Sequence, residues 1–160
     1  MGIIKSILAS TDLSDGSAHG IKYACNLAKD IGAEVIIINA IPMDEVMSAF
    51  RQVQENPSSG QDQYKGLEQR LVNRHKQLLD EMVKQQAPEV SSDLKIRKVV
   101  EVGEPYSILI DWAKKEHVDL IVMSTHGRSG IPRMMLGSVT ERVLRGSPCP
   151  VLAIPLPHEH

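Results

Sequence analysis

Cysteine is scarce in this sequence and long hydrophobic runs are absent, and each absence excludes a class of protein. The two cysteines, Cys25 and Cys149, are too few for a disulfide framework, so we expect reduced thiols in apolar surroundings. No segment reaches the roughly 18 apolar residues of a membrane-spanning helix, and no signal peptide is recognisable at the N-terminus. The sequence therefore predicts a cytoplasmic protein that has no membrane as a partner.

Net charge is also low, at −2, but it is distributed unevenly along the chain. Residues 125–146 contain four arginines and one glutamate, a net charge of +3, so the remaining residues sum to −5. Proteins that bind nucleic acid present a large basic face, which an acidic remainder does not provide. The basic stretch therefore favours a small anionic ligand and excludes nucleic acid as a partner.

Sequence motifs of several common catalytic and binding sites are missing as well. There is no G-x-x-x-x-G-K-[ST] phosphate loop, and no G-x-G-x-x-G follows the first apolar segment. A serine hydrolase site would have to pair Ser124 or Ser138 with His126 and Asp12, but the G-x-S-x-G turn is absent. The histidines lack the spacing of metal ligands; they are His19, His75, His117, His126, His158 and His160. We therefore expect no catalytic residues and no metal held by the protein itself.

Two kinds of segment alternate along the chain. Short apolar segments rich in branched residues predict five β-strands, at 2–10, 34–41, 95–102, 119–125 and 150–155. Amphipathic patterns predict helices between them, at 14–31, 64–86, 105–117 and 138–145. This alternation predicts one domain over residues 1–160, an α/β fold with a doubly wound five-stranded parallel sheet between helices, and the last strand at its edge. Ligands of such sheets bind beyond the carboxyl ends of the strands, where the strand order reverses.

Residues 44–63 do not fit the alternation. The segment, "DEVMSAFRQVQENPSSGQDQ", is polar and includes "NPSSG", and it is long for a connection inside a compact domain. We expect a flexible insertion here, and it is a candidate surface for a regulatory partner.

The connection after the fourth predicted strand is unusually rich in glycine. It reads "STHGRSGIPRMMLGSVTE" over residues 124–141, and a helix is predicted to begin at Ser138. A helix N-terminus has unpaired backbone N–H groups and a partial positive charge, both of which suit phosphate. Gly127 and Gly137 would let the backbone approach phosphate oxygens without a Cβ in the way. The stretch therefore predicts a loop that holds phosphate groups by its backbone.

The same residues allow other interpretations. Glycines in loops commonly serve only as turn formers, and Arg128 and Arg133 could be solvated without contacting a ligand. Ser138 and Glu141 have the S-x-x-E spacing of a capping box, in which the serine only caps its helix. An RNA-binding G-x-x-G loop would join two helices, whereas a buried strand precedes this one. The residues by themselves leave phosphate binding and a plain helix cap both open.

Residues 123–155, "MSTHGRSGIPRMMLGSVTERVLRGSPCPVLAIP", resemble the C-terminal signature of the universal stress protein family. The nucleotide-binding branch of that family carries the pattern G-2x-G-9x-G-[S/T]. Gly127 takes the second glycine position of the pattern, and Gly137 with Ser138 closes it. Ser124 stands where the family has its first glycine, and Gly130 is an additional glycine inside the nine residues.

The resemblance extends through nearly the whole chain. "ILASTDLSDGSAHGIKYACNLA" is similar to the first strand and helix of the family, which implies that Asp12 faces the nucleoside. "IINAIP" resembles the end of the second strand, where Ala40 would lie against adenine, and "VEVGEPYSILIDWA" places Gly103 and Pro105 at the rim of the site. The resemblance thus implies a binding site made of Ser10, Thr11, Asp12, Ala40, Gly103, Ser124, His126, Gly127, Arg128, Gly130, Gly137, Ser138, Val139 and Thr140.

The resemblance also implies what this site would do. We expect ATP, with Mg²⁺ or Mn²⁺ carried mainly by its phosphates, and slow or no hydrolysis because no residue is placed to direct a water molecule. Nucleotide occupancy would then affect a surface recognised by an unknown regulatory protein. A homodimer is expected through the last strand, Val151–Ile154. The alternative is a dimeric interaction scaffold that binds no nucleotide, with Ser124 as the mark of a degraded site.

Overall fold

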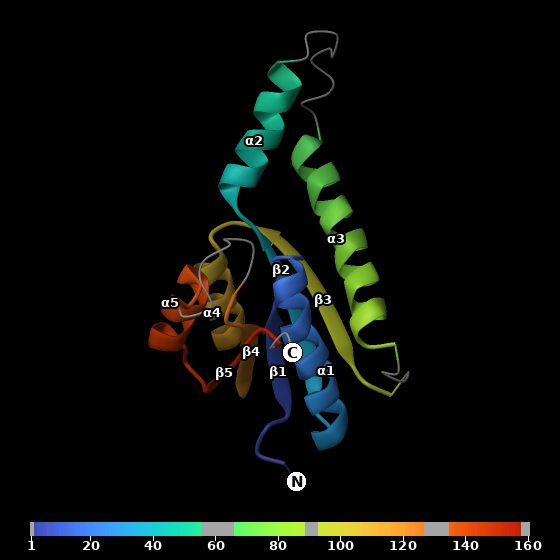
Figure 1. Cartoon of the computed structure of the whole chain (residues 1–160), viewed down its shortest axis with the longest axis vertical. Helices are drawn as coiled ribbons and strands as arrows, with labels where there is room; N and C mark the ends of the chain where they lie inside the picture. The colour runs from blue at the N-terminus through green and yellow to red at the C-terminus, as the bar shows by residue number, and fades with distance from the viewer. Residues whose placement is uncertain (1, 56–65, 89–92, 127–134, 158–160) are drawn as a thin grey trace.

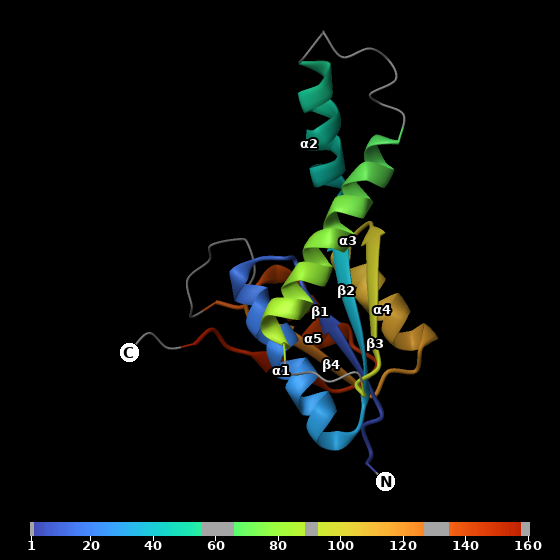
Figure 2. The same ribbon diagram turned by 90° about the vertical axis from the view of Figure 1, so that its right-hand side faces the viewer.

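The computed structural model describes residues 2–55, 66–88, 93–126 and 135–157, and it shows one parallel sheet between two layers of helices (Figures 1 and 2). Its five strands are β1 (Ser6–Ser10), β2 (Glu34–Ile41), β3 (Ile96–Val102), β4 (Leu120–Ser124) and β5 (Val151–Ile154). They pair in parallel in the order β3-β2-β1-β4-β5. The predicted fold is confirmed, including the position of the last strand at an edge, and the strand order reverses between β1 and β4.

The helices cover both faces of this sheet. They are α1 (Asp15–Ile31), α2 (Met43–Gln54), α3 (Leu67–Gln86), α4 (Pro105–Lys115) and α5 (Ser138–Gly146). Successive strand residues face opposite layers, so Ile7 packs with α1 and α3 while Leu8 packs with α4 and α5. Along the described ranges, no helix combines the length and the apolar character needed to cross a membrane.

Local chemistry explains where α1 begins and ends. Ser14 is the N-cap, and its side chain accepts a hydrogen bond from the backbone N–H of Ser17. Gly32 ends the helix in the left-handed conformation, with φ at 73°, which costs glycine little because it has no Cβ. These ends agree with the helix predicted at 14–31, and the cap sets the geometry of the turn that joins β1 to α1.

Part of the segment 44–63, expected as a flexible insertion, is regular in structure, because Met43–Gln54 forms the helix α2. The sequence feature that predicts this helix is the helical spacing of two apolar residues, Val46, which is buried, and Phe50, which packs against the core. Polar residues on the other face of α2 obscure this spacing in the sequence. With the N-terminal half of α3, α2 extends beyond the sheet (Figures 1 and 2), and we call α2 and α3 the protruding helices. Residues 56–65 lie outside the described residues.

Both cysteines are free thiols, but only one is fully buried. Cys25 is 0% exposed within α1, and burial raises the pKa of its thiol to about 11. Cys149 is partly exposed next to the cluster beneath α4 and α5. The prediction of buried apolar surroundings therefore holds for Cys25 and is wrong in part for Cys149, because the chain there runs along the surface toward the edge strand.

Candidate functional site

A cavity of about 480 Å³ opens at the carboxyl ends of β1, β2 and β4, where the strand order reverses. Its volume falls within the range of about 300–1,000 Å³ that is usual for small-molecule sites. Ten of the residues expected at a binding site line it, namely Ser10, Thr11, Asp12, Ala40, Ser124, His126, Gly137, Ser138, Val139 and Thr140. Segments distant in sequence thus meet where parallel sheets bind their ligands.

The remaining expected residues are placed differently. Gly127, Arg128 and Gly130 lie outside the described residues. Gly103 does not line the cavity; its backbone N–H donates to the carbonyl of Ile41 at 2.9 Å, at the turn that leads to α4. A Cβ on Gly103 would lie 3.1 Å from Cδ1 of Ile108, and its φ of 152° also favours glycine. Gly103 therefore shapes this turn, and Pro105 at the start of α4 reaches the cavity instead.

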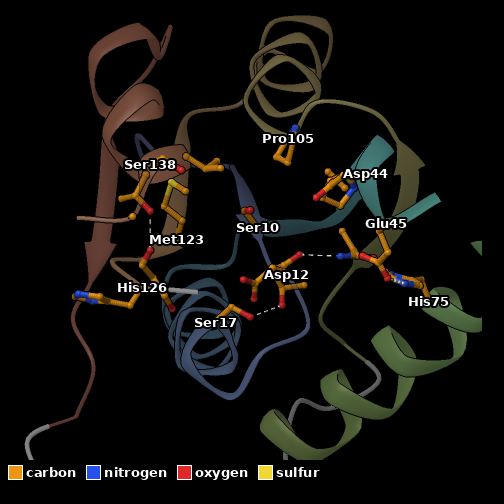
Figure 3. A pocket seen from close by; sticks show the side chains of 18 residues that line it. Ser10, Asp12, Ser17, Asp44, Glu45, His75, Pro105, Met123, His126 and Ser138 are labelled. Carbon is orange, nitrogen blue, oxygen red and sulfur yellow. Dashed lines mark hydrogen bonds and ion pairs between the residues drawn. The ribbon is translucent and has the colours of Figure 1, made fainter. Parts of the chain in front are cut away.

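Asp12 follows β1 in a tight turn at the floor of the cavity (Figure 3). Its Oδ1 accepts hydrogen bonds from the backbone N–H of Ser14 at 3.0 Å and from the Ser14 hydroxyl at 2.5 Å. Leu13 between them has a φ of 64°, a conformation that a non-glycine residue adopts only when its surroundings impose it. Asp12 thus holds the turn after β1 and also lines the cavity, so a structural role and a role in ligand binding are compatible at this residue.

The N-terminus of α5 forms the opposite end of the cavity (Figure 3). Gly137 is the N-cap of α5, and its N–H donates to the carbonyl of Thr125 at 2.9 Å. The capping-box interpretation of Ser138 and Glu141 is therefore wrong, because Ser138 is the first helical residue and Glu141 instead pairs with Arg145 at 2.9 Å. The backbone N–H groups of the first turn have no intrahelical acceptor, which leaves them suited to an anion.

The side chain of Ser124 is hydrogen-bonded to α1. Its Oγ accepts a hydrogen bond from the backbone N–H of Gly20 at 3.1 Å, and the residue is buried. Its carbonyl accepts a second hydrogen bond from the hydroxyl of Thr140 at 2.9 Å, which joins the end of β4 to the first turn of α5. Ser124 therefore connects β4 with both α1 and α5.

His126 has a different orientation from the one expected. Its Nδ1 lies 2.8 Å from the hydroxyl oxygen of Thr125, and Figure 3 shows its ring turned away from the centre of the cavity. The residue is buried and borders the cavity without pointing its imidazole into it. The sequence placed His126 next to the glycine pattern, but the direction of its side chain depends on how the loop packs.

A second histidine at the cavity, His75 on α3, was missed by the sequence analysis. Its Nδ1 lies 2.7 Å from Oδ1 of Asn39 at the end of β2, and its Nε2 lies 2.9 Å from Oε1 of Glu45 on α2. The amide nitrogen of Asn39 donates in turn to the carbonyl of Thr11 at 3.0 Å. An asparagine inside an otherwise apolar buried strand was the available signal, because a buried amide requires partners.

Charge is divided across the cavity. Asp12, Asp44 and Glu45 place carboxylates along one side, while Ser138 and the α5 N-terminus lie across from them (Figure 3). Because a helix N-terminus attracts negative charge and carboxylates accept hydrogen bonds, the site suits a ligand that is anionic at one end and carries donors at the other.

These features define a class of protein, the doubly wound α/β proteins with a cavity at the switch point of the sheet. The model of the universal stress protein family matches residues 4–155, and the chain therefore belongs to the universal stress protein family. Universal stress protein MJ0531 of Methanocaldococcus jannaschii is 34% identical over 155 residues, which span 97% of this chain and 84% of that protein. Universal stress protein YxiE of Bacillus subtilis is 30% identical over 154 residues, which span 95% of this chain and 99% of that protein.

Solved structures share the same fold. The structure of MJ0577, described as a hypothetical protein, superimposes with a TM-score of 0.76 at 26% identity, covering 99% of this chain and 100% of that one. A universal stress protein solved in complex with cAMP has a TM-score of 0.63 at 23% identity, covering 96% and 98% of the two chains. One from Archaeoglobus fulgidus in complex with dAMP has a TM-score of 0.54 at 17% identity, covering 96% and 99%.

Proposed function

We propose that this protein is an ATP-binding universal stress protein, a cytoplasmic regulatory protein that holds ATP with slow or no hydrolysis. The observation that carries the proposal is the division of one cavity between the N-terminus of α5 and the carboxylates of Asp12, Asp44 and Glu45. A nucleotide has the matching division, since its phosphates are anionic and its ribose and adenine carry hydrogen-bond donors.

The phosphates would lie against the first turn of α5. Gly137, Ser138 and Val139 line the cavity there, and they offer backbone N–H groups and one hydroxyl. Mg²⁺ or Mn²⁺ would arrive on the phosphates, because the described residues contain no cluster of three or more His, Cys, Asp or Glu side chains placed to hold a metal ion. Gly127, Arg128 and Gly130, which lie outside the described residues, remain sequence-based candidates for this end of the site.

The nucleoside would extend toward Asp12 and Ala40. The carboxylate of Asp12 is suited to accept hydrogen bonds from ribose hydroxyls, and Ala40 offers a small apolar surface for a base. The complexes of two proteins of this fold with cAMP and dAMP support an adenine nucleotide as the class of ligand. The orientation of His126 supports slow or absent hydrolysis, because the ring of this histidine beside the glycine pattern points away from the cavity.

We also propose a homodimer through β5. This strand is at the edge of the sheet, and its residues Val151–Ile154 are all partly exposed. An unpaired strand edge presents N–H and C=O groups that a second copy can pair with across a two-fold axis. A regulatory partner would then recognise a surface that nucleotide binding changes.

Nucleotide release and calorimetry test the ATP proposal. The untagged protein is denatured and any released nucleotide is separated by chromatography, and the nucleotide-free protein is titrated with Mg-ATP. We expect saturable binding that Gly137→Val abolishes, because its branched side chain enters a site where the first Cβ already lies 3.3 Å from the carbonyl oxygen of Thr125.

Gly2→Val is the matched control for that variant. A Cβ on Gly2 meets its nearest atom at 3.6 Å, an ordinary contact, and Gly2 is remote from the cavity. Neither released nucleotide nor heat at millimolar ATP would overturn the proposal and leave the alternative, an interaction scaffold that binds no nucleotide. Equal loss of binding in both variants would also count against the phosphate site at Gly137.

A further inference from the structure

A continuous chain of hydrogen bonds connects the candidate nucleotide site to the protruding helices (Figure 3). It runs from the carbonyl of Thr11 to Asn39 at 3.0 Å, from Asn39 to His75 at 2.7 Å, and from His75 to Glu45 at 2.9 Å. Asn39 is 1% exposed and His75 is 4% exposed, so the bond between them is shielded from solvent, while the side chain of Glu45 is 30% exposed. Four segments are joined in this way: the end of β1, β2, α2 and α3.

Both ring nitrogens of His75 have a polar partner. The amide nitrogen of Asn39 donates to Thr11, so Oδ1 is the atom of Asn39 that faces Nδ1 of His75. The other ring nitrogen, Nε2, faces a carboxylate oxygen of Glu45. His75 therefore joins β2 on one side of its ring to α2 on the other.

Both ends of this chain border the cavity. Thr11 lines it from the β1 end, next to Asp12, and Glu45 lines it from the first turn of α2. Between them, His75 is the residue through which α3 bonds to both sides. A ligand that shifts the turn after β1 or the start of α2 thus acts on α3 through short, directional bonds.

We propose that His75 is a positioning residue that couples occupancy of the cavity to the protruding helices α2 and α3. The inference rests on the proposed nucleotide binding and adds the route by which binding would alter a surface. Coupling of this kind requires a contiguous physical connection between the site and the segment that responds, and the buried chain of Thr11, Asn39, His75 and Glu45 supplies it.

Hydrogen–deuterium exchange with and without Mg-ATP tests the proposal. In the unchanged protein we expect ATP to slow exchange in residues 137–146, in residues 6–17 and in α2. In His75→Gln, the slowing in α2 should fall by about fivefold or more while the slowing in residues 137–146 remains. His19→Gln, on α1 and away from the chain of bonds, is the matched control and should behave like the unchanged protein.

Glu45→Gln and Glu45→Ala together separate positioning from simple structural support. The glutamine amide offers both a donor and an acceptor to Nε2 of His75, so Glu45→Gln can keep the bond between α2 and α3, whereas Glu45→Ala removes it. The slowing of exchange in α2 by ATP should persist in Glu45→Gln and fall in Glu45→Ala, while the slowing in residues 137–146 remains in both. Equal slowing of α2 in the two variants would overturn the proposal, and this comparison also decides the matter if His75→Gln fails to fold.

Failure of nucleotide binding can be told apart from failure of this coupling. If calorimetry detects no ATP binding to the unchanged protein, the proposed function fails, and the ligand-free proteins still test the connection. His75→Gln should then accelerate exchange in both the β1–α1 turn and α2, and acceleration confined to α3 would overturn the proposal. If ATP binds and His75→Gln retains full slowing in α2, the coupling is overturned while the proposed function stands.

Discussion

The hydroxyl oxygen of Ser124 lies 3.1 Å from the backbone nitrogen of Gly20, and a Cβ built on Gly20 would lie 2.9 Å from that same oxygen. The serine at the end of β4 is therefore accommodated by the missing side chain at one position of α1. Because its hydroxyl is engaged by α1, Ser124 has a role in packing that does not depend on a ligand.

Gly20→Ala should destabilise the fold by about 1–3 kcal/mol, because the added methyl group overlaps a well-packed contact. Part of that loss should disappear in the Ser124→Gly background, since the hydroxyl is gone but the backbone nitrogen of residue 124 still lies 3.1 Å from the new Cβ. Urea unfolding of the two single variants and the double variant measures the difference. If Gly20→Ala lowered the free energy of unfolding equally in both backgrounds, the proposed overlap with the Ser124 hydroxyl would be wrong.

Asp12→Asn should weaken ATP binding by about tenfold to a hundredfold, as expected when a hydrogen bond loses its charged acceptor. The fold should be little affected, because the asparagine Oδ1 can still accept from the backbone N–H of Ser14, which now bonds to Asp12 at 3.0 Å. Calorimetric titration measures the affinity, and thermal unfolding checks the fold. Asp15→Asn, in the exposed first turn of α1, is the control and should bind like the unchanged protein.

Thiol labelling should distinguish the two cysteines. In the folded protein we expect one rapidly reacting thiol, the partly exposed Cys149, while Cys25 reacts only on unfolding because it is 0% exposed. Rapid labelling of both thiols without denaturant would contradict the buried position of Cys25.

Stability should also decline at alkaline pH because of Cys25. Burial raises the pKa of its thiol from 9.0 to about 11, so the unfolded chain loses this proton at a lower pH than the folded one. The contribution is therefore fully present below pH 9.0 and is lost as the pH rises through about 11. Cys25→Ala should show a smaller decline than the unchanged protein over this interval, measured as the free energy of unfolding in urea. Identical declines in the two proteins would contradict the assignment.

Ala153→Pro should convert the proposed dimer to a monomer. The carbonyls of Pro150 and Ile154 accept hydrogen bonds from β4, so the alternation of a parallel strand directs the N–H of Ala153 to the open edge of the sheet. Proline removes that N–H without removing a bond to β4. Light scattering after size-exclusion chromatography measures the mass, and Ala153→Ser, which keeps the N–H, should remain dimeric. A dimer that persists in Ala153→Pro would place the interface elsewhere.

Much of the architecture follows from the sequence because its signals are local. The near-continuous apolar segments of β2 and β4 can be buried on both faces only in a parallel sheet, and Ser14 and Gly32 mark the ends of α1 correctly. The position of Asp12 could be predicted as well, because it depends only on where the first strand ends. The helix α2 was missed because its apolar stripe is narrow and interrupted by polar residues.

No local sequence pattern predicts the hydrogen bonds around His75. Asn39 and His75 are 36 residues apart, and Glu45 is 30 residues from His75 on a different helix. Whether a histidine is exposed on a helix or buried with two polar partners depends on which helix packs against which strand end. The same limit applies to Ser124, whose effect depends on Gly20, 104 residues away in the chain.

The sequence by itself determined the order of the five strands and of four of the five described helices, the parallel sheet and the helix that begins after the glycine-rich segment, because periodicity and helix caps act over a few neighbouring residues. Only the tertiary structure decided which side chains meet at the cavity and in which direction they bond. Burial forces each polar group there to find a partner, and that partner comes from whichever distant segment the packing brings within hydrogen-bond distance.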